Sequence, residues 1–130
     1  MRIITKELLE KAAEKLKNNP EFIHVSRVME GTITFKDDNG CAFISFYHGK
    51  IVEVEDGKCL YGSDYYIRAA NENWIKAFTR TDERYGIYEL DGNLIEFDGN
   101  QYAFAGNAKT FYMLWLALRA AYLEGGRIND

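Results

Sequence analysis

The chain begins with a helical pattern of hydrophobic and polar positions. One apolar stripe is formed by Leu8, Leu9, Ala12, Ala13 and Leu16. Charged side chains occupy the opposite side, as in a helix that packs one face on a core. Thr5 is a suitable N-cap, and Asn18-Asn19-Pro20 ends the pattern because the residue before a proline avoids helical angles. We therefore expect an amphipathic packing helix after Thr5.

From Glu21 onward the apolar positions alternate with a period of two, which predicts strands with one buried face. The expected extended segments are residues 22–29, 32–36, 41–47, 51–55 and 64–68. Turn signals rich in Asp, Asn and Gly separate several of them, at 37–40, 48–49 and 56–57. Strands this close together, joined by glycine turns, predict an antiparallel meander.

The second half of the chain mixes helices and strands. Asn71 is expected to cap a short helix with Trp74, Ile75 and Phe78 on its inner side. The other expected elements are a loop at 79–86, strands at 87–90 and 94–97, a strand or extended lead-in at 101–105, and a final helix capped by Asn107 and ended by Gly125-Gly126. This order predicts an α+β fold, and we expect residues 1–130 to form a single domain.

The final helix, over residues 109–123, is unusual because it is apolar nearly all the way round. Only Lys109 and Arg119 carry charge in it. A surface helix needs one apolar stripe, and a chain of 130 residues has little protein with which to surround a helix on every side. We therefore expect a bound apolar molecule, a second copy of the chain or a membrane to cover the remaining face.

Composition narrows the function. Hydrophobic residues make up 47% and aromatic residues 15% of the chain, which suits a ligand pocket as well as a core. The net charge of -4 argues against nucleic-acid binding, which requires a basic surface. The N-terminus lacks the apolar core of a signal peptide, and the longest apolar run, 111–118, is far shorter than the ~20 residues of a membrane-spanning helix. We expect a soluble cytoplasmic protein.

Candidate chemistry is sparse. The two histidines, His24 in an expected strand and His48 in an expected turn, have no partners at metal-ligand spacing. Cys41 and Cys59 are too few for a disulfide framework and are expected to act as small buried hydrophobes. Most Asp residues of the middle of the chain stand in turns, where they bond the local backbone. We expect no catalytic residue, no metal site and no cofactor.

Four segments, at residues 49–54, 62–67, 71–78 and 92–100, together resemble the sterol carrier protein family, the type-2 lipid-transfer domain. In that family a meander ends in an Asp-bearing strand. A helix with an aromatic residue follows, and then a segment of pattern Gly-x-hydrophobic-x-hydrophobic-x-Gly that ends in Asn or Asp. The resemblance spans residues 32–100 and departs afterwards, where residues 101–106 precede a longer helix than the family typically has.

The resemblance implies a mostly antiparallel, twisted sheet of about five strands covered by helices, with a hydrophobic tunnel between the layers. Such domains bind sterols, fatty acyl chains or phospholipids without chemistry and without a metal. We therefore expect a non-enzymatic protein that binds a lipid between the sheet and the C-terminal helix. Transfer of the bound lipid is an option that the resemblance leaves open. The expected cavity-lining residues are Trp74, Ile75, Phe78, Phe97, Phe111, Tyr112, Trp115 and Leu118.

Two rival functions remain open at this point. In one, the last helix packs against its counterpart in a homodimer, which makes an interaction module without a ligand. In the other, the fold encloses a small-cavity enzyme of the isomerase or dehydratase type, with Tyr112 or Tyr122 beside Asp64. Such an enzyme needs an acid–base pair that converges inside a pocket.

Overall fold

The computed structural model describes residues 2–58, 62–79, 95–99 and 101–125. Its helices are α1 (Lys6–Lys17), α2 (Pro20–Val25), α3 (Asn71–Thr79), α5 (Gln101–Gly106) and α6 (Ala108–Gly125). Its strands are β1 (Gly31–Lys36), β2 (Cys41–Tyr47), β3 (Lys50–Asp56), β4 (Tyr65–Arg68) and β5 (Glu96–Gly99). The predicted strand at 87–90 lies outside the described residues. The α+β class is confirmed.

The five strands form one sheet in the order β3-β2-β1-β4-β5. The predicted meander is confirmed for β1, β2 and β3, which pair antiparallel in sequence order. The strand β4 does not continue the meander on the far side of β3. Instead β4 lies on the other side of β1 and runs parallel to it, while β5 pairs antiparallel with β4. The sheet is therefore mixed, with one parallel pairing and three antiparallel pairings.

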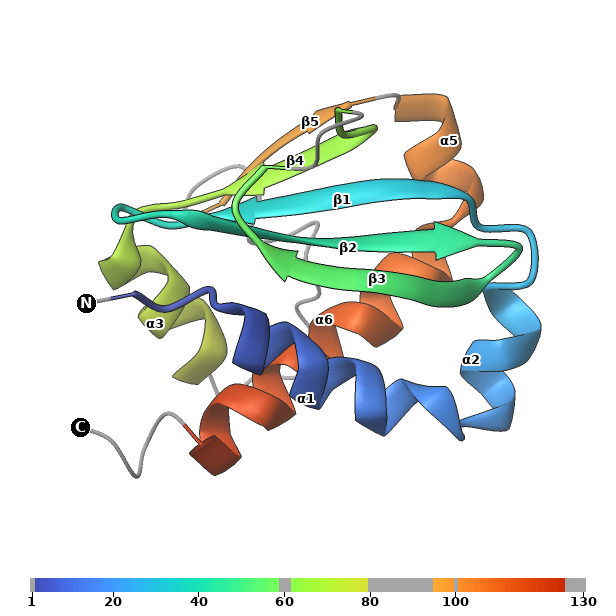
Figure 1. The fold of residues 1–130 in the computed structure, drawn as a ribbon, viewed down its shortest axis with the longest axis horizontal. Helices are drawn as coiled ribbons and strands as arrows, with labels where there is room; N and C mark the ends of the chain where they lie inside the picture. Colours follow the sequence, from blue (N-terminus) through green and yellow to red (C-terminus); the bar gives the residue numbers. More distant parts are fainter. Residues whose placement is uncertain (1, 59–61, 80–94, 100, 126–130) are drawn as a thin grey trace.

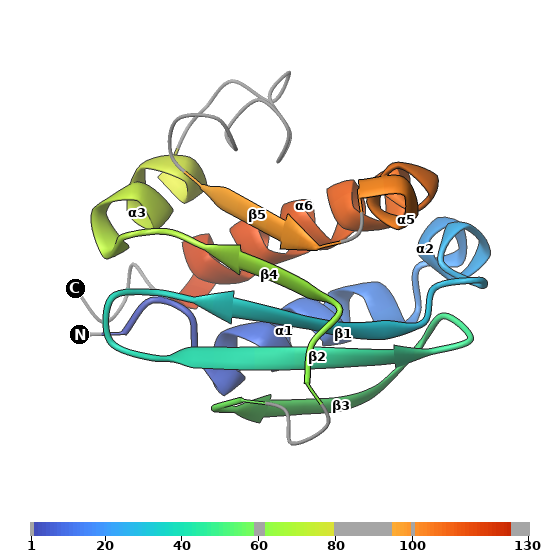
Figure 2. The same ribbon diagram turned by 90° about the horizontal axis from the view of Figure 1, so that it is seen from above.

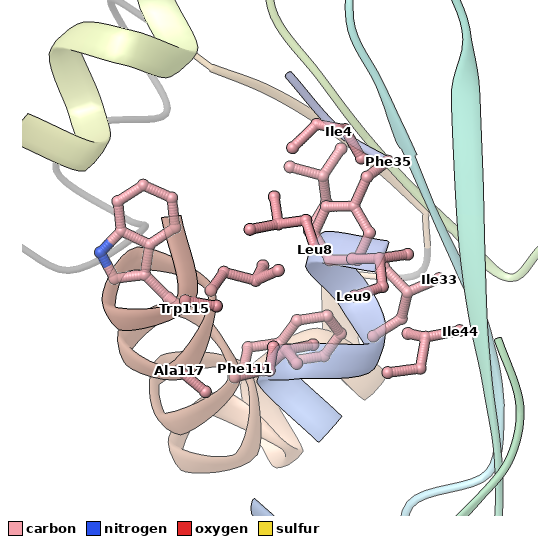
Figure 3. Packing of buried hydrophobic residues seen from close by; sticks show 14 of the residues in the cluster. Ile4, Leu8, Leu9, Ile33, Phe35, Ile44, Phe111, Trp115 and Ala117 are labelled. Atoms are coloured by element: carbon pink, nitrogen blue, oxygen red, sulfur yellow. The ribbon is translucent and has the colours of Figure 1, made fainter. Parts of the chain in front are cut away.

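The helices α1, α3 and α6 lie on one face of this sheet, as Figures 1 and 2 show. Side chains along each strand point alternately to the two faces of the sheet. On the inner face Ile33 pairs with Ile44, and Phe35 pairs with Ala42, and all four are buried. Figure 3 shows Ile33, Phe35 and Ile44 on the side of the sheet that faces Leu9 of α1 and Phe111 of α6. Burial of this layer, at about 25 cal/mol per Å² of apolar surface, holds the helices on the sheet.

The first helix follows its sequence signals. The Thr5 hydroxyl accepts a hydrogen bond of 3.2 Å from the Leu8 amide, and α1 ends at Lys17. The prediction of extended chain for the segment that follows is wrong. Residues 20–25 form α2, because the Asn19 side chain caps the amides of Glu21 and Phe22 and Pro20 occupies the first helical turn. His24 is therefore a helix residue.

The lead-in to the last helix differs in the same way. Residues 101–106 form the short helix α5, not a strand or an extended segment. Phe104 of α5 packs against Phe97 and Phe111, with ring centroids 4.2 Å and 4.7 Å away. A tertiary contact of this kind decides the conformation of a short apolar segment whose sequence alone is ambiguous.

Three of the chain's own helices contact α6, and the expectation that something outside the chain covers its remaining face stays a prediction. The hydroxyl of Thr110 donates to the Val25 carbonyl of α2 at 3.3 Å, and Arg119 Nε donates to the Phe78 carbonyl of α3 at 3.1 Å. On the α1 side, Lys15 pairs with Glu124. Leu116, 37% exposed, is the one large apolar side chain of α6 that counts as exposed among the described residues. These contacts cover one side of α6, while the residues along its other side are half-buried or exposed, namely Tyr112, Met113, Leu116, Ala120 and Leu123.

Candidate hydrophobic ligand site

Seven of the eight predicted lining residues belong to the hydrophobic core or pack against it, mostly as ring clusters, and Tyr112 is the exception. In the first cluster Phe78 stacks on Trp74, Trp115 and Tyr122, with centroids 5.5, 5.2 and 5.0 Å away. Trp74 and Phe78 are fully buried, and Trp115 is 2% exposed. Leu118 is buried in the same core. Aromatic pairs at these distances fill space and stabilise one another.

The second cluster joins the far end of the sheet to α5 and α6. Phe111 contacts Tyr65 edge-on at 5.0 Å and Phe97 edge-on at 6.1 Å. Ile75 and Tyr112, the two other predicted residues, are half-buried. Ile75 packs against the core, whereas Tyr112 is not part of it. The role of the eight residues as the lining of a ligand cavity stays a prediction.

A groove of about 700 Å³ lies elsewhere, between α1, α2 and the edge strand β3. Its volume falls within the range of about 300–1,000 Å³ that is typical of small-molecule sites. Its apolar lining is formed by Ala13, Leu16, Phe22, Ile23, Ile51, Val52 and Val54. Charged side chains of both signs line it as well, among them Lys6, Glu10, Lys17, Arg27, Lys50 and Glu53. None of the eight predicted residues lines this groove.

A β-bulge gives β3 its apolar wall. Ile51 pairs with Phe46 and Val54 pairs with Ile44, so both face the helix layer. In a regular strand, residues three apart point to opposite faces. The register shift between Ser45 and Phe46 leaves Val52 as the extra residue and restores the inward direction of Ile51. The bulge therefore adds a third apolar side chain, Val52, to the same groove.

Backbone contacts hold α2 and the β2–β3 turn together at one end of the groove. The Gly49 amide donates to the Met29 carbonyl at 2.8 Å, and the Ser26 hydroxyl donates to the Gly49 carbonyl at 3.3 Å. Gly49 has a φ of 80°, and a Cβ there would stand 2.4 Å from the Ser26 carbonyl oxygen. Only glycine permits this close approach.

Several charged groups of the groove have partners among the described residues. The carboxylate of Glu55 hydrogen-bonds the Lys6 ammonium and raises its pKa, which keeps Lys6 charged. His48 pairs with Glu30 at 3.1 Å, and the Arg27 guanidinium donates to the His24 carbonyl at 2.6 Å. Among the described residues, no group of three His, Cys, Asp or Glu could hold a metal ion. Cys41 is a free thiol, and Cys59 lies outside the described residues.

Sequence reasoning missed this groove because it assigned α2 to a strand. Phe22 and Ile23, which help to line it, point there only because residues 20–25 are helical. A signal is present in the sequence: Asn19 followed by Pro20 is an N-cap followed by a first-turn proline. The same residues also mark the end of α1. They were therefore interpreted only as the end of one helix, although they also begin the next one.

No protein-family model matches the sequence, and no curated protein matches it either. Solved structures do match. A conserved hypothetical protein of Thermus thermophilus, described as possibly a sterol carrier protein, is similar with a TM-score of 0.70 at 18% identity, over 93% of this chain and 90% of that one. A sterol carrier protein 2 is similar with a TM-score of 0.68 at 17% identity, over 86% and 93%. This chain has the sterol carrier protein 2 fold.

The sterol carrier protein domain 2 of Helicoverpa armigera also shares this fold, with a TM-score of 0.52 at 18% identity over 87% of this chain and 84% of that one. Identities this low concern the fold, since function belongs to the sites that each chain builds on it. The sterol carrier protein 2 fold confirms the family resemblance seen in the sequence at the level of architecture. None of the described helices is long and apolar enough to cross a membrane.

Proposed function

We propose that this chain binds a hydrophobic ligand, such as a fatty acid, a sterol or another lipid, in the groove between α1, α2 and β3. The observation that carries the proposal is an apolar groove of about 700 Å³ on a sterol carrier protein 2 fold. Burial of the ligand's hydrocarbon would supply the affinity, at about 0.8 kcal/mol per buried methylene. The proposed role is binding without a covalent step.

The lining of the groove supports an apolar ligand. Leu16 and Phe22 are 3% exposed and belong to the core, so the floor of the groove is rigid and apolar. Ile23 and Val52 are 55% and 61% exposed and stand at its open side. A ligand that covers these two side chains removes apolar surface of the protein from water as well as its own.

The test is uptake of a fluorescent fatty acid, together with native mass spectrometry of the gently purified protein. Ala13→Phe places a ring into the groove from α1, and we expect it to lower the affinity at least tenfold. Ala70→Phe is the matched control, because Ala70 is also half-buried but does not line the groove. Equal affinities of the two variants, or no uptake by the unaltered protein, would overturn the proposal.

The core layer that holds seven of the eight predicted residues, all but Tyr112, is the second location for the same ligand. Trp74 and Trp115 are the two tryptophans of the chain, both lie in that layer, and neither lines the groove. A brominated fatty acid quenches tryptophan emission by contact. Strong quenching that Ala13→Phe leaves intact would place the ligand between the sheet and α6. Weak quenching that disappears with Ala13→Phe would place it in the groove.

The rival functions have less support. An Asp64-based enzyme requires an acid–base pair inside a pocket, whereas Asp64 is exposed and does not line the groove. A homodimer through α6 requires a broad exposed apolar face, whereas Leu116 is the one large apolar side chain of α6 that counts as exposed among the described residues.

A further inference from the structure

The turn between β1 and β2 carries the one Asn–Gly step of the sequence, Asn39-Gly40. Asparagine is chemically labile, and it is most so before glycine, because glycine has no side chain to obstruct attack by its own backbone nitrogen. Asn39 is exposed, so water reaches the site. The dipeptide has the chemistry of spontaneous deamidation, a modification that needs no enzyme.

The reaction begins at the backbone amide of Gly40. Its nitrogen loses a proton to the solvent and forms a bond to Cγ of Asn39, while the Cγ–Nδ2 bond breaks and Nδ2 leaves as ammonia. Water then opens the resulting succinimide ring at one of its two carbonyl carbons. Opening at Cγ leaves an aspartate, and opening at the main-chain carbon leaves an isoaspartate, whose backbone runs through Cβ and Cγ. No electrons are transferred, and water is the only co-reactant.

The native turn holds the two amides that this reaction must move. Oδ1 of Asp37 accepts hydrogen bonds of 2.8 Å from the amides of Asn39 and Gly40. The Gly40 carbonyl in turn accepts a bond of 3.0 Å from the Asp37 amide. Two successive amides that donate to one oxygen point in the same direction, which fixes the rotation about the Cα–C bond of Asn39. Attack on Cγ requires this bond to rotate and the Gly40 amide to lose its proton, so at least one of these hydrogen bonds must break first.

Two further contacts fix the turn from outside. The Asp38 amide donates to Asn71 Oδ1 at 3.0 Å, and the Asn71 amide donates to Asp38 Oδ2 at 2.9 Å. The Arg2 guanidinium lies against Gly40, where a Cβ would stand 2.8 Å from its Nε. Both ribbon views show the β1–β2 turn beside the N-terminal segment and α3 (Figures 1 and 2). The turn is therefore tied to two other parts of the molecule.

We infer that Asn39-Gly40 is a deamidation site that the native turn keeps inactive and that reacts when the turn opens. Asp37 is the residue that keeps it inactive. A hydrogen bond to a charged group lowers the population of the open turn by about a factor of ten or more. Because the reaction proceeds through the open turn, folding slows it by at least that factor.

The modification has a consequence for the fold. An isoaspartate lengthens the backbone of the turn by a carbon atom, so the two amides no longer converge on Oδ1 of Asp37. The other oxygen of the same carboxylate holds the amides of Ile3 and Ile4. A modified turn therefore loosens the N-terminal segment, and since ammonia is lost, the asparagine does not re-form. A molecule whose turn has opened can thus carry a lasting chemical mark.

The test is peptide mass mapping of the full chain after incubation at neutral pH, folded and in urea, with an isoaspartate methyltransferase to count the isoaspartate. We expect Asn39 to deamidate at least about tenfold faster in urea than in the folded protein. Asn39→Gln should abolish the product, because the longer side chain would have to close a larger ring. In the folded protein, Asp37→Asn should raise the rate at least about fivefold, because a neutral amide accepts weaker bonds from the turn.

The matched control is Gly49→Ala. It strains the β2–β3 turn, at the opposite end of β2, and leaves the β1–β2 turn untouched. While this variant is folded, the rate at Asn39 should equal that of the unaltered protein. Should Asp37→Asn fail to fold, Asn71→Ala takes its place: it releases Asp38 at the surface and should raise the rate at least about twofold.

Equal rates in the folded and the unfolded protein would overturn the inference. A slower reaction in folded Asp37→Asn would also overturn it, because the carboxylate would then act as the base for the Gly40 amide. Equal rates in the Asp37 or Asn71 variant and in the Gly49 control would do the same. The inference does not rest on the proposed ligand site, so Ala13→Phe should leave the rate at Asn39 unchanged.

Discussion

The carboxylate of Asp37 connects the β1–β2 turn to the N-terminal segment. Its Oδ1 accepts hydrogen bonds of 2.8 Å from the amides of both Asn39 and Gly40. Its Oδ2 accepts bonds of 2.6 Å and 2.9 Å from the amides of Ile3 and Ile4, which are 34 and 33 residues away in sequence. Since Ile4 is fully buried, water cannot replace this acceptor without local unfolding.

We predict that Asp37→Asn lowers the free energy of unfolding by about 3 kcal/mol. The amide group keeps one oxygen and presents an NH₂ in place of the other, so two of the four N–H groups lose their acceptor. A hydrogen bond to a charged group contributes about 1.5–3 kcal/mol, and the lower value applies because the turn amides are partly accessible to water. A domain of this size has about 5–15 kcal/mol of stability, so the variant should still fold.

The assay is urea unfolding followed by tryptophan fluorescence, since Trp74 and Trp115 are buried in the native protein. The midpoint should fall while the slope with denaturant stays constant. Asp98→Asn is the matched control: Asp98 is exposed on β5 and accepts no hydrogen bond from the described residues, so its loss should stay within about 0.5 kcal/mol. A loss below about 1 kcal/mol for Asp37→Asn, or an equal loss in the control, would contradict this account of the carboxylate.

Two further predictions concern the backbone of the groove and the aromatic core. Gly49→Ala should destabilise the protein by clearly more than Gly57→Ala: both glycines have positive φ, at 80° and 88°, but only at Gly49 does a Cβ meet the Ser26 carbonyl. Strain at either position costs about 1–3 kcal/mol, so the difference in urea midpoint reports the clash, and equal midpoints would argue against it. Burial, and to a lesser degree the charge of Asp64, raises the pKa of Tyr65 above 10.0. The unfolded chain therefore ionises first and stability is lost as the pH rises above about 10, so Tyr65→Phe should reduce the fall in melting temperature between pH 9 and pH 11.

Much of the architecture was predictable from local signals. The α1 helix, the hairpins of β1, β2 and β3, and the helix with Trp74 and Phe78 each carry their own periodicity, caps or turn residues. The role of Asp37 in its own turn was likewise readable, because an Asp before Asn and Gly bonds the nearby amides. Its bonds to Ile3 and Ile4 were not readable, since no local pattern records which distant amides a carboxylate will meet.

The short elements show the limit of such reasoning. Residues 20–25 and 101–106 are too short for their periodicity to separate helix from strand, and their neighbours decide. The parallel pairing of β1 with β4 is of the same kind, because any strand with one apolar face could have taken that place in the sheet.

The order of residues is enough to specify an α+β protein whose aromatic residues gather between a sheet and a last helix. Periodicity states which face of each element is apolar, and an apolar face must be buried. What covers each face depends on the packing in three dimensions. That packing places α6 beside α1, α2 and α3, and it leaves an apolar groove beside β3, where a bulge turns Ile51 inward and α2 supplies Phe22. Contacts between distant elements produce these outcomes, and the local pattern of residues does not record them.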